Sequence, residues 1–181
     1  MKYFTPSEAV QLINSGESVY IQGSTSIPEV LCKALADRGD ELRDVTIYAA
    51  FAVGRCEAPF CRPEYKDSFN IKSLFVANNI RKWLAAGYGS TIPAFLGEIP
   101  GLFRDGTLPL DAVFLNVSQP NDEGYCSFGV SADLAVSAVE CASKVIVQVN
   151  KAMPFSYGDA LIHVSRIDDA VEVRSEERRV G

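Results

Sequence analysis

Apolar runs and polar breaks alternate along the chain in an order that predicts strands separated by helices. Residues 113–117 (Val-Phe-Leu-Asn-Val) are rich in β-branched and aromatic side chains and too short to favour a helix, so they predict a buried strand. Small apolar residues in 133–142 recur at the spacing of one helix face, and residues 144–149 (Lys-Val-Ile-Val-Gln-Val) predict a second strand. A strand, a helix and a strand in this order predict a βαβ unit with parallel strands and a right-handed crossover.

The loop inside this unit is the first candidate ligand site. Residues 118–129 are rich in Pro, Asn, Asp and Gly and therefore predict irregular structure. In parallel sheets ligands bind outside the carboxyl ends of the strands, and an acidic group there has the position of a general acid or base. An acidic residue beside Asn and Gly is also typical of a plain turn, so both interpretations stay open. The candidate residues of this loop are Ser118, Asp122, Gly124 and Tyr125.

A second candidate site lies near the amino terminus, where a strand at 18–22 is expected to lead into a helix at 28–38. Ser26 and Glu29 predict a capping box with Pro28 in the first turn. A strand that enters a helix through a small-residue turn leaves backbone N–H groups available to an anion or an oxyanion. An ordinary strand-to-helix connection is the alternative. The candidate residues here are Gly23, Ser24, Thr25 and Pro28.

The rest of the chain predicts further elements of the same type, joined by irregular segments. In chain order these are a helix opened by a Thr5–Glu8 capping box, strands at 45–50 and 72–77, a helix at 79–86 ended by Gly87, a long excursion at 53–69, an irregular segment with helical turns at 89–106, and a last strand at 161–167. Together they predict an α/β fold, a mostly parallel sheet with flanking helices.

Composition and charge narrow the classes of partner. The 181 residues are 48% hydrophobic, which is enough for one domain with a full core. A net charge of −6 argues against nucleic acid and anionic membranes as main partners. The chain has no run of eighteen apolar residues and no apolar signal core at its start, so we predict a cytoplasmic protein without a membrane span.

The residue types that carry metal or nucleophilic chemistry give weak signals. Five scattered cysteines do not suggest a disulfide framework, and Cys56 with Cys61 and one distant histidine would make a poor zinc site, so no metal is expected. His163 is the only histidine, and its apolar neighbours favour a structural residue in a strand over a catalytic one. The sequence contains no nucleophile elbow, P-loop or dinucleotide fingerprint.

Three blocks of sequence carry information about the family of the protein that local hydrophobic patterns do not give. The first carries Ser7-Glu8-Ala9-Val10, Ile21-Gln22-Gly23 and Ile27-Pro28-Glu29-Val30-Leu31; the second carries Leu108-Pro109-Leu110-Asp111, Val117-Ser118 and residues 122–129; the third carries Gln148-Val149-Asn150, Met153-Pro154, Gly158-Asp159 and Ile162-His163-Val164-Ser165. In order and spacing, from about Pro6 to Asp169, they resemble the amino-terminal domain of the acetyl-CoA hydrolase/transferase family, which includes 4-hydroxybutyrate and butyrate–acetate CoA-transferases.

The resemblance implies an α/β domain of the CoA-transferase/isomerase type and a covalent reaction. In the family a glutamate attacks an acyl-CoA, giving a mixed anhydride and then an enzyme–CoA thioester that passes CoA to a carboxylate such as acetate. Coenzyme A is thus expected as a substrate and not as a resident cofactor, and the full-length protein is expected to be a homo-oligomer. The eight candidate residues of the two loops are expected to bind CoA in a cleft that faces a second domain.

The resemblance assigns no catalytic residue to this chain. The family's glutamate and its glycine-rich CoA-binding loop belong to a carboxyl-terminal domain, and none of Glu57, Glu64, Glu98 or Glu123 lies in that motif. Position 123 is often histidine in relatives and is glutamate here. We therefore expect the 181-residue chain to be inactive alone and to expose the apolar face that meets its partner domain.

The end of the sequence departs from the family pattern. Residues 174–181 match nothing in the family and resemble a translated sequencing-library adapter. We predict a family domain over residues 1–173, a non-native or disordered tail over 174–181 and a native chain that continues; a native charged tail is the alternative. An acyl-CoA hydrolase and a non-catalytic α/β small-molecule-binding module or subunit remain alternative functions.

Overall fold

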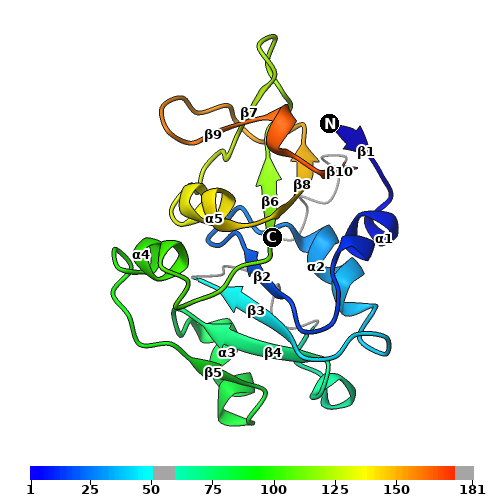
Figure 1. Cartoon of the computed structure of the whole chain (residues 1–181), viewed down its shortest axis with the longest axis vertical. Coiled ribbons are helices and arrows are strands. Elements are labelled where there is room, and N and C mark those ends of the chain that lie inside the picture. The colour runs from blue at the N-terminus through cyan, green and yellow to red at the C-terminus, as the bar shows by residue number, and fades with distance from the viewer. Residues whose placement is uncertain (51–59, 174–181) are drawn as a thin grey trace.

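An eight-stranded, wholly parallel sheet forms the centre of the molecule (Figure 1). The computed structural model describes residues 1–50 and 60–173. The sheet strands are β1 (Lys2–Tyr3), β2 (Ser18–Ile21), β3 (Val45–Ala49), β4 (Phe69–Ser73), β5 (Gly89–Thr91), β6 (Ala112–Val117), β8 (Lys144–Asn150) and β10 (Asp169–Val173). Their order across the sheet is β1-β10-β8-β6-β2-β3-β4-β5. The predicted fold class is confirmed.

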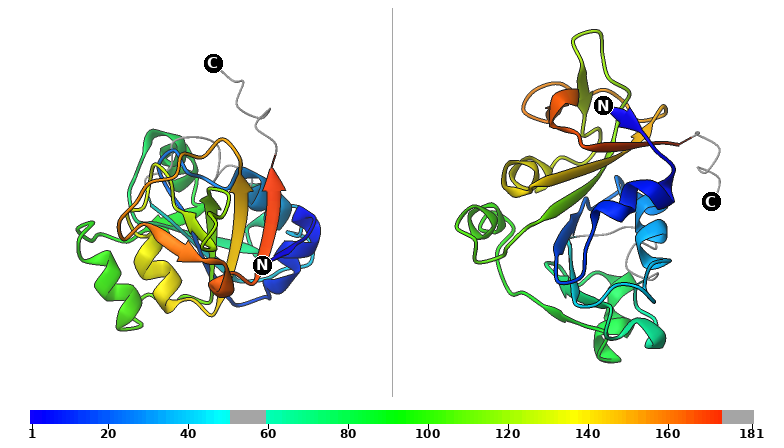
Figure 2. Two further views of the ribbon diagram at one scale, coloured as in Figure 1. Left: turned by 90° about the horizontal axis from the view of Figure 1, so that it is seen from above. Right: turned by 45° about the vertical axis from the view of Figure 1, so that its right-hand side comes forward.

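Helices cover both faces of this sheet. They are α1 (Pro6–Ala9), α2 (Glu29–Ala36), α3 (Asn78–Ala85), α4 (Ile99–Arg104) and α5 (Ala135–Cys141). Figure 2 shows the blue helices α1 and α2 on one side of the strands and α4 (green) and α5 (yellow) on the other. One core packs Leu31 of α2 and Ile80 of α3 against one face, and the other packs Phe103 of α4 and Ala138 of α5 against the opposite face. A parallel sheet covered on both sides requires apolar residues in succession, which explains the continuous apolar runs.

The predicted βαβ unit is present. β6 and β8 are parallel neighbours, with Phe114 opposite Ile146 and Asn116 opposite Gln148, and α5 connects them. All six side chains of β6 are buried. Successive residues of a strand point to opposite faces, so Phe114 packs toward α2 and Leu115 toward α5.

The strand order reverses direction between β2 and β6. From β2 the sheet grows through β3, β4 and β5, whereas from β6 it grows through β8, β10 and β1. Asp111 joins the amino ends of these two central strands, because its carboxylate accepts hydrogen bonds from the Ser18 backbone N–H (2.8 Å) and hydroxyl (2.9 Å). The loops that leave β2 and β6 therefore begin side by side at a topological switch point, where open α/β sheets bind ligands.

One strand prediction in the first half of the chain was wrong in position. The strand expected at 72–77 is β4, Phe69–Ser73, whose Phe69, Ile71 and Ser73 side chains are buried in register with β3. The apolar run after Ser73 has already left the sheet. The helical turns expected in 89–106 are present as α4, but the short edge strand β5 at the start of this segment was not predicted.

The carboxyl-terminal third also differs from expectation. The predicted loop 118–129 contains β7 (Tyr125–Ser127), which pairs antiparallel with β9 (Leu161–His163) in a separate two-stranded sheet. The strand expected at 161–167 is thus shorter and lies outside the main sheet. It was not the last strand either, since β10 follows and pairs with β8.

Candidate functional site

Gln22 ties together the segments that meet at the switch point. It directly follows β2, and its side chain is fully buried. Its Oε1 accepts the Asn116 backbone N–H (2.7 Å), while its Nε2 donates to the carbonyls of Phe128 (3.2 Å) and Ser131 (2.6 Å). The start of the β2 loop is thereby held to β6 and to the segment that precedes α5.

Helix α2 begins differently from the sequence prediction. Pro28 is the residue that directly precedes the helix. Among the described residues, no nearby side chain forms a capping hydrogen bond with the first turn of α2. The Ser26–Glu29 capping box is therefore wrong, because Glu29 is the first helical residue and not the third. The backbone N–H of Val30 instead donates to Oε1 of Gln148, a buried residue of β8 (3.1 Å).

Two buried polar atoms near the start of α2 have no hydrogen-bond partner among the described residues: Ser26 Oγ and Asn116 Oδ1. Asn116 lies beside Gln148 on the neighbouring strand, and both point to the sheet face that α2 covers. A buried polar atom without a partner costs about 1–3 kcal/mol, so such atoms usually mark a functional constraint or a place for a ligand. Asn116 and Gln148 are thus neighbouring buried amides at the switch point, and Ser26 is a buried serine of the β2 loop that leads into α2.

The four predicted residues of the β2 loop differ in their access to solvent. Gly23 and Pro28 are buried, Ser24 is partly exposed and Thr25 is exposed. Ser24 has a φ of 55°, a left-handed conformation that is uncommon for a residue with a side chain. Only Ser24 and Thr25 of the four therefore present side chains to the outside.

Tyr20 of β2 supports this loop from below. Its hydroxyl donates to Oδ1 of Asp133 (3.4 Å). Burial, and then the negative charge of Asp133, raise the pKa of Tyr20 well above its ordinary value, and a hydrogen bond with the Gly23 backbone opposes this. Tyr20 is consequently uncharged at neutral pH, and its role is to hold the loop through hydrogen bonds and not to act as a general acid.

In the β6 loop, Ser118 is already fully engaged. Its backbone N–H donates to the Ser127 carbonyl, and its Oγ accepts the Ser127 N–H, both at 2.9 Å. The same hydroxyl donates to the Gln119 carbonyl (2.9 Å). Ser118 is buried, so it closes the base of the loop.

The tip of this loop is a turn stabilised by Asn121. Its Oδ1 accepts the backbone N–H groups of Glu123 (3.1 Å) and Tyr125 (2.8 Å). Asp122 and Glu123 are exposed at this tip, which is the turn arrangement left open as an alternative. The loop between β6 and β7 projects from the body at the top of Figure 1.

Gly124 and Tyr125 pack against the single histidine. Gly124 has a φ of 82°, and a Cβ there would lie 2.9 Å from Nε2 of His163. The Tyr125 and His163 rings meet edge to face, 5.0 Å apart. His163 lies at the end of β9 as predicted, and its Nδ1 accepts the Ser165 backbone N–H (3.3 Å).

A second glycine joins two of the sequence blocks that carry the family resemblance. Gly129 has a φ of 68°, and a Cβ there would overlap Sδ of Met153. Next to it, Ser127 Oγ accepts the N–H groups of Gly129 and Ser156, both at 3.0 Å. The second and third blocks are therefore halves of one packed unit.

The remaining glutamates and the cysteine considered from the sequence are not part of this site as described. Glu57 and Cys56 lie outside the described residues, Glu64 belongs to a 3₁₀ turn, and Glu98 accepts the Phe95 N–H (3.0 Å). Within residues 1–50 and 60–173, no three His, Cys, Asp or Glu side chains are grouped closely enough to hold a metal ion. No helix in the same ranges is long and apolar enough to span a membrane.

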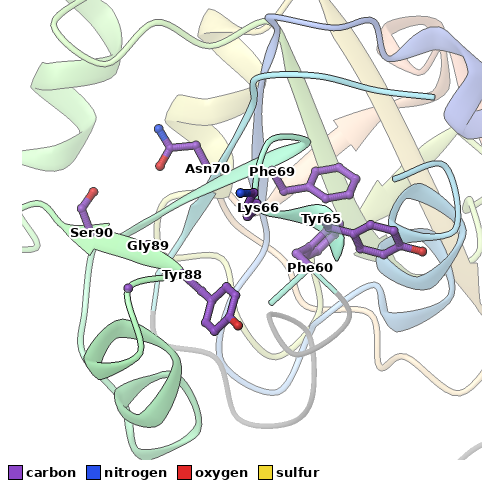
Figure 3. Close-up of a pocket in the computed structure, with 9 residues that line it drawn as sticks. Phe60, Tyr65, Lys66, Phe69, Asn70, Tyr88, Gly89 and Ser90 are labelled. Atoms are coloured by element: carbon purple, nitrogen blue, oxygen red, sulfur yellow. The ribbon is translucent and has the colours of Figure 1, made fainter. Parts of the chain in front are cut away.

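A hollow of about 230 Å³ lies at the opposite edge of the sheet, where β4 and β5 begin (Figure 3). Figure 3 shows the aromatic side chains of Phe60, Tyr65, Phe69 and Tyr88 around it. Tyr65 and Phe69 are buried parts of the α2-side core. The amino edge of a parallel sheet is not where ligands of such folds bind, so this hollow is separate from the candidate site.

Sequence reasoning missed Gln22, Asn116 and Gln148 as site residues. Each is a polar residue within or directly after a run of strand-forming apolar residues. Because a buried amide needs hydrogen-bond partners, an amide in such a run is itself a signal of a polar interior site. The structure brings the two predicted loops to neighbouring strands, but the partners of these amides are visible only in three dimensions.

Comparison with known proteins places this arrangement in a described family. A sequence model of the acetyl-CoA hydrolase/transferase N-terminal domain matches residues 1–177. The chain is 36% identical over 171 residues to 4-hydroxybutyrate coenzyme A transferase of Clostridium kluyveri, which covers 94% of this chain and 39% of that protein.

Solved structures give the same result. RipA from Yersinia pestis superimposes with a TM-score of 0.87 and 30% identity over 96% of this chain and 42% of that chain. A 4-hydroxybutyrate CoA-transferase from Porphyromonas gingivalis gives a TM-score of 0.78 and 31% identity over 99% of this chain and 41% of that one. The chain spans about two fifths of the length of these relatives.

Proposed function

This chain belongs to the acetyl-CoA hydrolase/transferase family, whose amino-terminal domain it matches, and from that premise we propose that it forms one wall of a CoA-transferase active site. The reaction moves CoA between a short-chain acyl-CoA and a carboxylate such as acetate or 4-hydroxybutyrate. A glutamate in the carboxyl-terminal part of the complete enzyme attacks the acyl-CoA and carries CoA as a thioester.

The observation that carries this proposal is the match over residues 1–177 together with the position of the two loops at the switch point. Relatives named for CoA transfer share this whole unit. The loops after β2 and β6 start at the same edge of the sheet, and a second domain placed against that edge would enclose a cleft.

The residues of this chain bind and orient the substrates and do not carry the nucleophile. We assign direct contact with CoA to the predicted residues that are at least partly exposed: Ser24, Thr25, Asp122, Gly124 and Tyr125. The buried residues Gly23, Pro28 and Ser118 shape the loops from within.

The two buried atoms without a partner add hydrogen-bonding capacity in the β2 loop and at the end of β6. Ser26 Oγ can donate or accept, and Asn116 Oδ1 can accept. Binding that supplies the missing partners gains more free energy than an ordinary exposed hydrogen bond, because the penalty of the unpaired atom disappears. We therefore place the reacting acyl end of the substrate near Ser26 and Asn116.

A fusion tests the proposal directly. This chain replaces the matching amino-terminal segment of the C. kluyveri relative, and transfer of CoA from butyryl-CoA to acetate is followed. We expect transfer by the fusion and none by the 181-residue chain alone, since the nucleophile lies elsewhere. Transfer by the isolated chain would contradict the division of labour.

The same assay separates transfer from hydrolysis. If acetate accepts CoA, loss of butyryl-CoA depends on acetate and yields acetyl-CoA. Loss of butyryl-CoA at an equal rate without acetate, with release of CoA alone, would identify an acyl-CoA hydrolase and overturn the transferase proposal.

A further inference from the structure

Gln148 uses only half of its buried side-chain amide. It lies in β8, is 5% exposed, and its Oε1 accepts the backbone N–H of Val30 in the first turn of α2 (3.1 Å). A backbone N–H can only donate, so the oxygen is the amide atom that faces the helix, and Nε2 is the atom that remains available. Within the described chain this Nε2 forms no hydrogen bond. A buried residue therefore has a hydrogen-bond donor left over.

Asn116, on the neighbouring strand β6, has the complementary group left over. The two residues are partners in the register of β6 and β8, and both side chains point to the face that α2 covers. Asn116 is 6% exposed, and its Oδ1 has no partner among the described residues. Neighbouring strands lie about 4.8 Å apart, so the longer Gln148 side chain can reach this oxygen. In this structure the Gln148 amide is turned to α2 instead, and that bond is not made.

The first turn of α2 is a place where a carboxylate can displace Gln148. α2 has eight residues, and Val30 is partly exposed, so the start of the helix is open to solvent. The acidic side chain of this turn, Glu29, is exposed, and water screens its charge. The start of a helix carries partial positive charge, and a carboxylate oxygen is a stronger acceptor than a neutral amide oxygen. Gln148 thus occupies a position that a carboxylate would fill more favourably.

CoA transfer supplies such a carboxylate in both halves of the reaction. Once the glutamate and the acyl group have formed the anhydride, the CoA thiolate attacks the glutamyl carbonyl. The new C–S bond forms, the C–O bond of the anhydride breaks, and the acyl group leaves as a carboxylate. The acceptor carboxylate then enters and reverses these steps. A free carboxylate is therefore bound where the acyl end has reacted, which is the region placed near Asn116.

We propose that Gln148 is a positioning residue that exchanges its hydrogen-bond partner when this carboxylate binds. The carboxylate takes the Val30 N–H, and the released Gln148 amide donates to Oδ1 of Asn116. The helix exchanges a neutral hydrogen bond for a charge-assisted one, and the buried oxygen gains its missing partner. The inference rests on the proposed function and deepens it, because it names the groups that hold the free carboxylate.

The side-chain amide signal of Gln148 reports this exchange without any reaction. Acetate is added to the fusion described above, with its glutamine and asparagine side chains labelled for NMR, and chloride at the same concentration controls for a general effect of salt. We expect the Gln148 side-chain signal to shift with acetate and not with chloride, because its partner changes. The signal of the exposed Gln11, which donates to the Ser7 carbonyl, should not move. A Gln148 signal that acetate leaves in place would overturn the proposal.

Variants of the fusion give a second test through the KM for acetate. Asn116→Leu should raise this KM about tenfold, since the released Gln148 amide finds no acceptor. Gln148→Leu should change it little, because one hydrogen bond is absent from the free state and another from the bound state. The double variant should behave like Gln148→Leu, so removal of Gln148 restores the affinity lost at Asn116. Asn70→Leu, at an exposed position of β4, is the matched control and should not change the KM.

A purely structural role would not produce this rescue. Asn116→Leu should leave the melting temperature unchanged or slightly raised, since it removes an unpaired buried oxygen, whereas Gln148→Leu should lower it, since Val30 loses its acceptor. Equal increases in KM for Asn116→Leu and the double variant would show that Asn116 contacts the substrate directly, and would overturn the exchange. Additive increases from the two single changes would overturn it as well.

The same experiments separate this inference from the proposed function. A fusion that transfers no CoA, but in which acetate shifts the Gln148 signal, would refute the proposed function and leave the exchange standing. CoA transfer by a fusion whose Gln148 signal does not respond to acetate would refute the exchange alone.

Discussion

The loops after β2 and β6 leave neighbouring strands at the same edge, yet they use their polar groups in opposite ways. In the β6 loop, Ser118, Asn121 and Ser127 all hydrogen-bond within the loop or to the segment after β8. In the β2 loop, Ser26 is buried without a partner within the described chain. The buried serines of the β6 loop are thus paired, whereas the β2 loop has a buried hydroxyl without a partner in the described chain.

The difference separates buried groups that hold a loop in shape from buried groups that can bind a ligand. The paired serines of the β6 loop gain nothing by binding, so contact with CoA in this loop falls to its exposed tip, while an unpaired buried atom gains the cost of its isolation. Both loops occupy the position that the fold reserves for ligands. The position of a loop therefore does not by itself identify its binding groups. The polar atoms that lack a hydrogen-bond partner do so.

The largest expected effect is on the packing of the β6 loop. Gly129→Val places a branched side chain where Sδ of Met153 lies, at a φ of 68°. We expect a loss of about 3 kcal/mol or more in the free energy of unfolding from overpacking and backbone strain. Urea unfolding measures it. Gly101→Ala in α4, where a Cβ meets open space, is the control and should be neutral or slightly stabilising.

The next largest effect on stability concerns the hydrogen bonds of Gln22, which join the end of β2 to β6 and to the segment before α5. Gln22→Leu leaves the Asn116 N–H and the Phe128 and Ser131 carbonyls without their partner. We expect a loss of about 2–3 kcal/mol, since buried backbone groups become unpaired. Gln119→Leu makes the same chemical change at an exposed position and should cost less than about 0.5 kcal/mol. Similar losses in the free energy of unfolding for both variants would show that the hydrogen bonds of Gln22 do not stabilise the fold.

Two serine-to-alanine changes set the loops against each other. Ser127→Ala removes the acceptor of two backbone N–H groups and should cost about 2 kcal/mol. Ser26→Ala removes a buried hydroxyl that has no partner in the described chain, so it should leave stability unchanged or raise it slightly. Equal destabilisation by both changes, measured by thermal and urea unfolding, would contradict the comparison.

A smaller, pH-dependent effect on stability comes from the buried thiol of Cys126 in β7. Burial raises the pKa of Cys126 to about 11, and the nearby N-terminal ammonium opposes this only partly. Stability should be unaffected by this group below about pH 8.5, where the unfolded thiol is also protonated, and should fall as pH rises toward 11. At pH 8, alkylation of Cys126 in the native protein should be about a hundredfold slower than alkylation of the half-exposed Cys141.

The sequence was sufficient for the centre of the fold. β6, α5 and β8 were predicted within a few residues because buried parallel strands must be apolar throughout, whatever surrounds them. The Thr5–Glu8 capping box is present as predicted, because its hydrogen bonds are local. The family resemblance is likewise confirmed by the match over residues 1–177.

Features that depend on distant contacts could not be predicted in this way. The apolar run after Ser73 was interpreted as strand, but Val76 in it is exposed and lies outside the sheet. α2 has no capping box because Gln148, far away in sequence, accepts its Val30 N–H. In the site, burial separated Ser118 from Thr25, two residues that local pattern treated alike.

The measurement that tests the central claim most directly is the steady-state kinetics of Ser26→Ala in the fusion. If the β2 loop supplies binding groups, kcat/KM for butyryl-CoA should fall about tenfold, the loss of one hydrogen bond, with the melting temperature unchanged. Ser127→Ala, the scaffold control, should lower the melting temperature and change kcat/KM little. An unchanged kcat/KM for Ser26→Ala would contradict the assignment of the β2 loop as the substrate-binding wall.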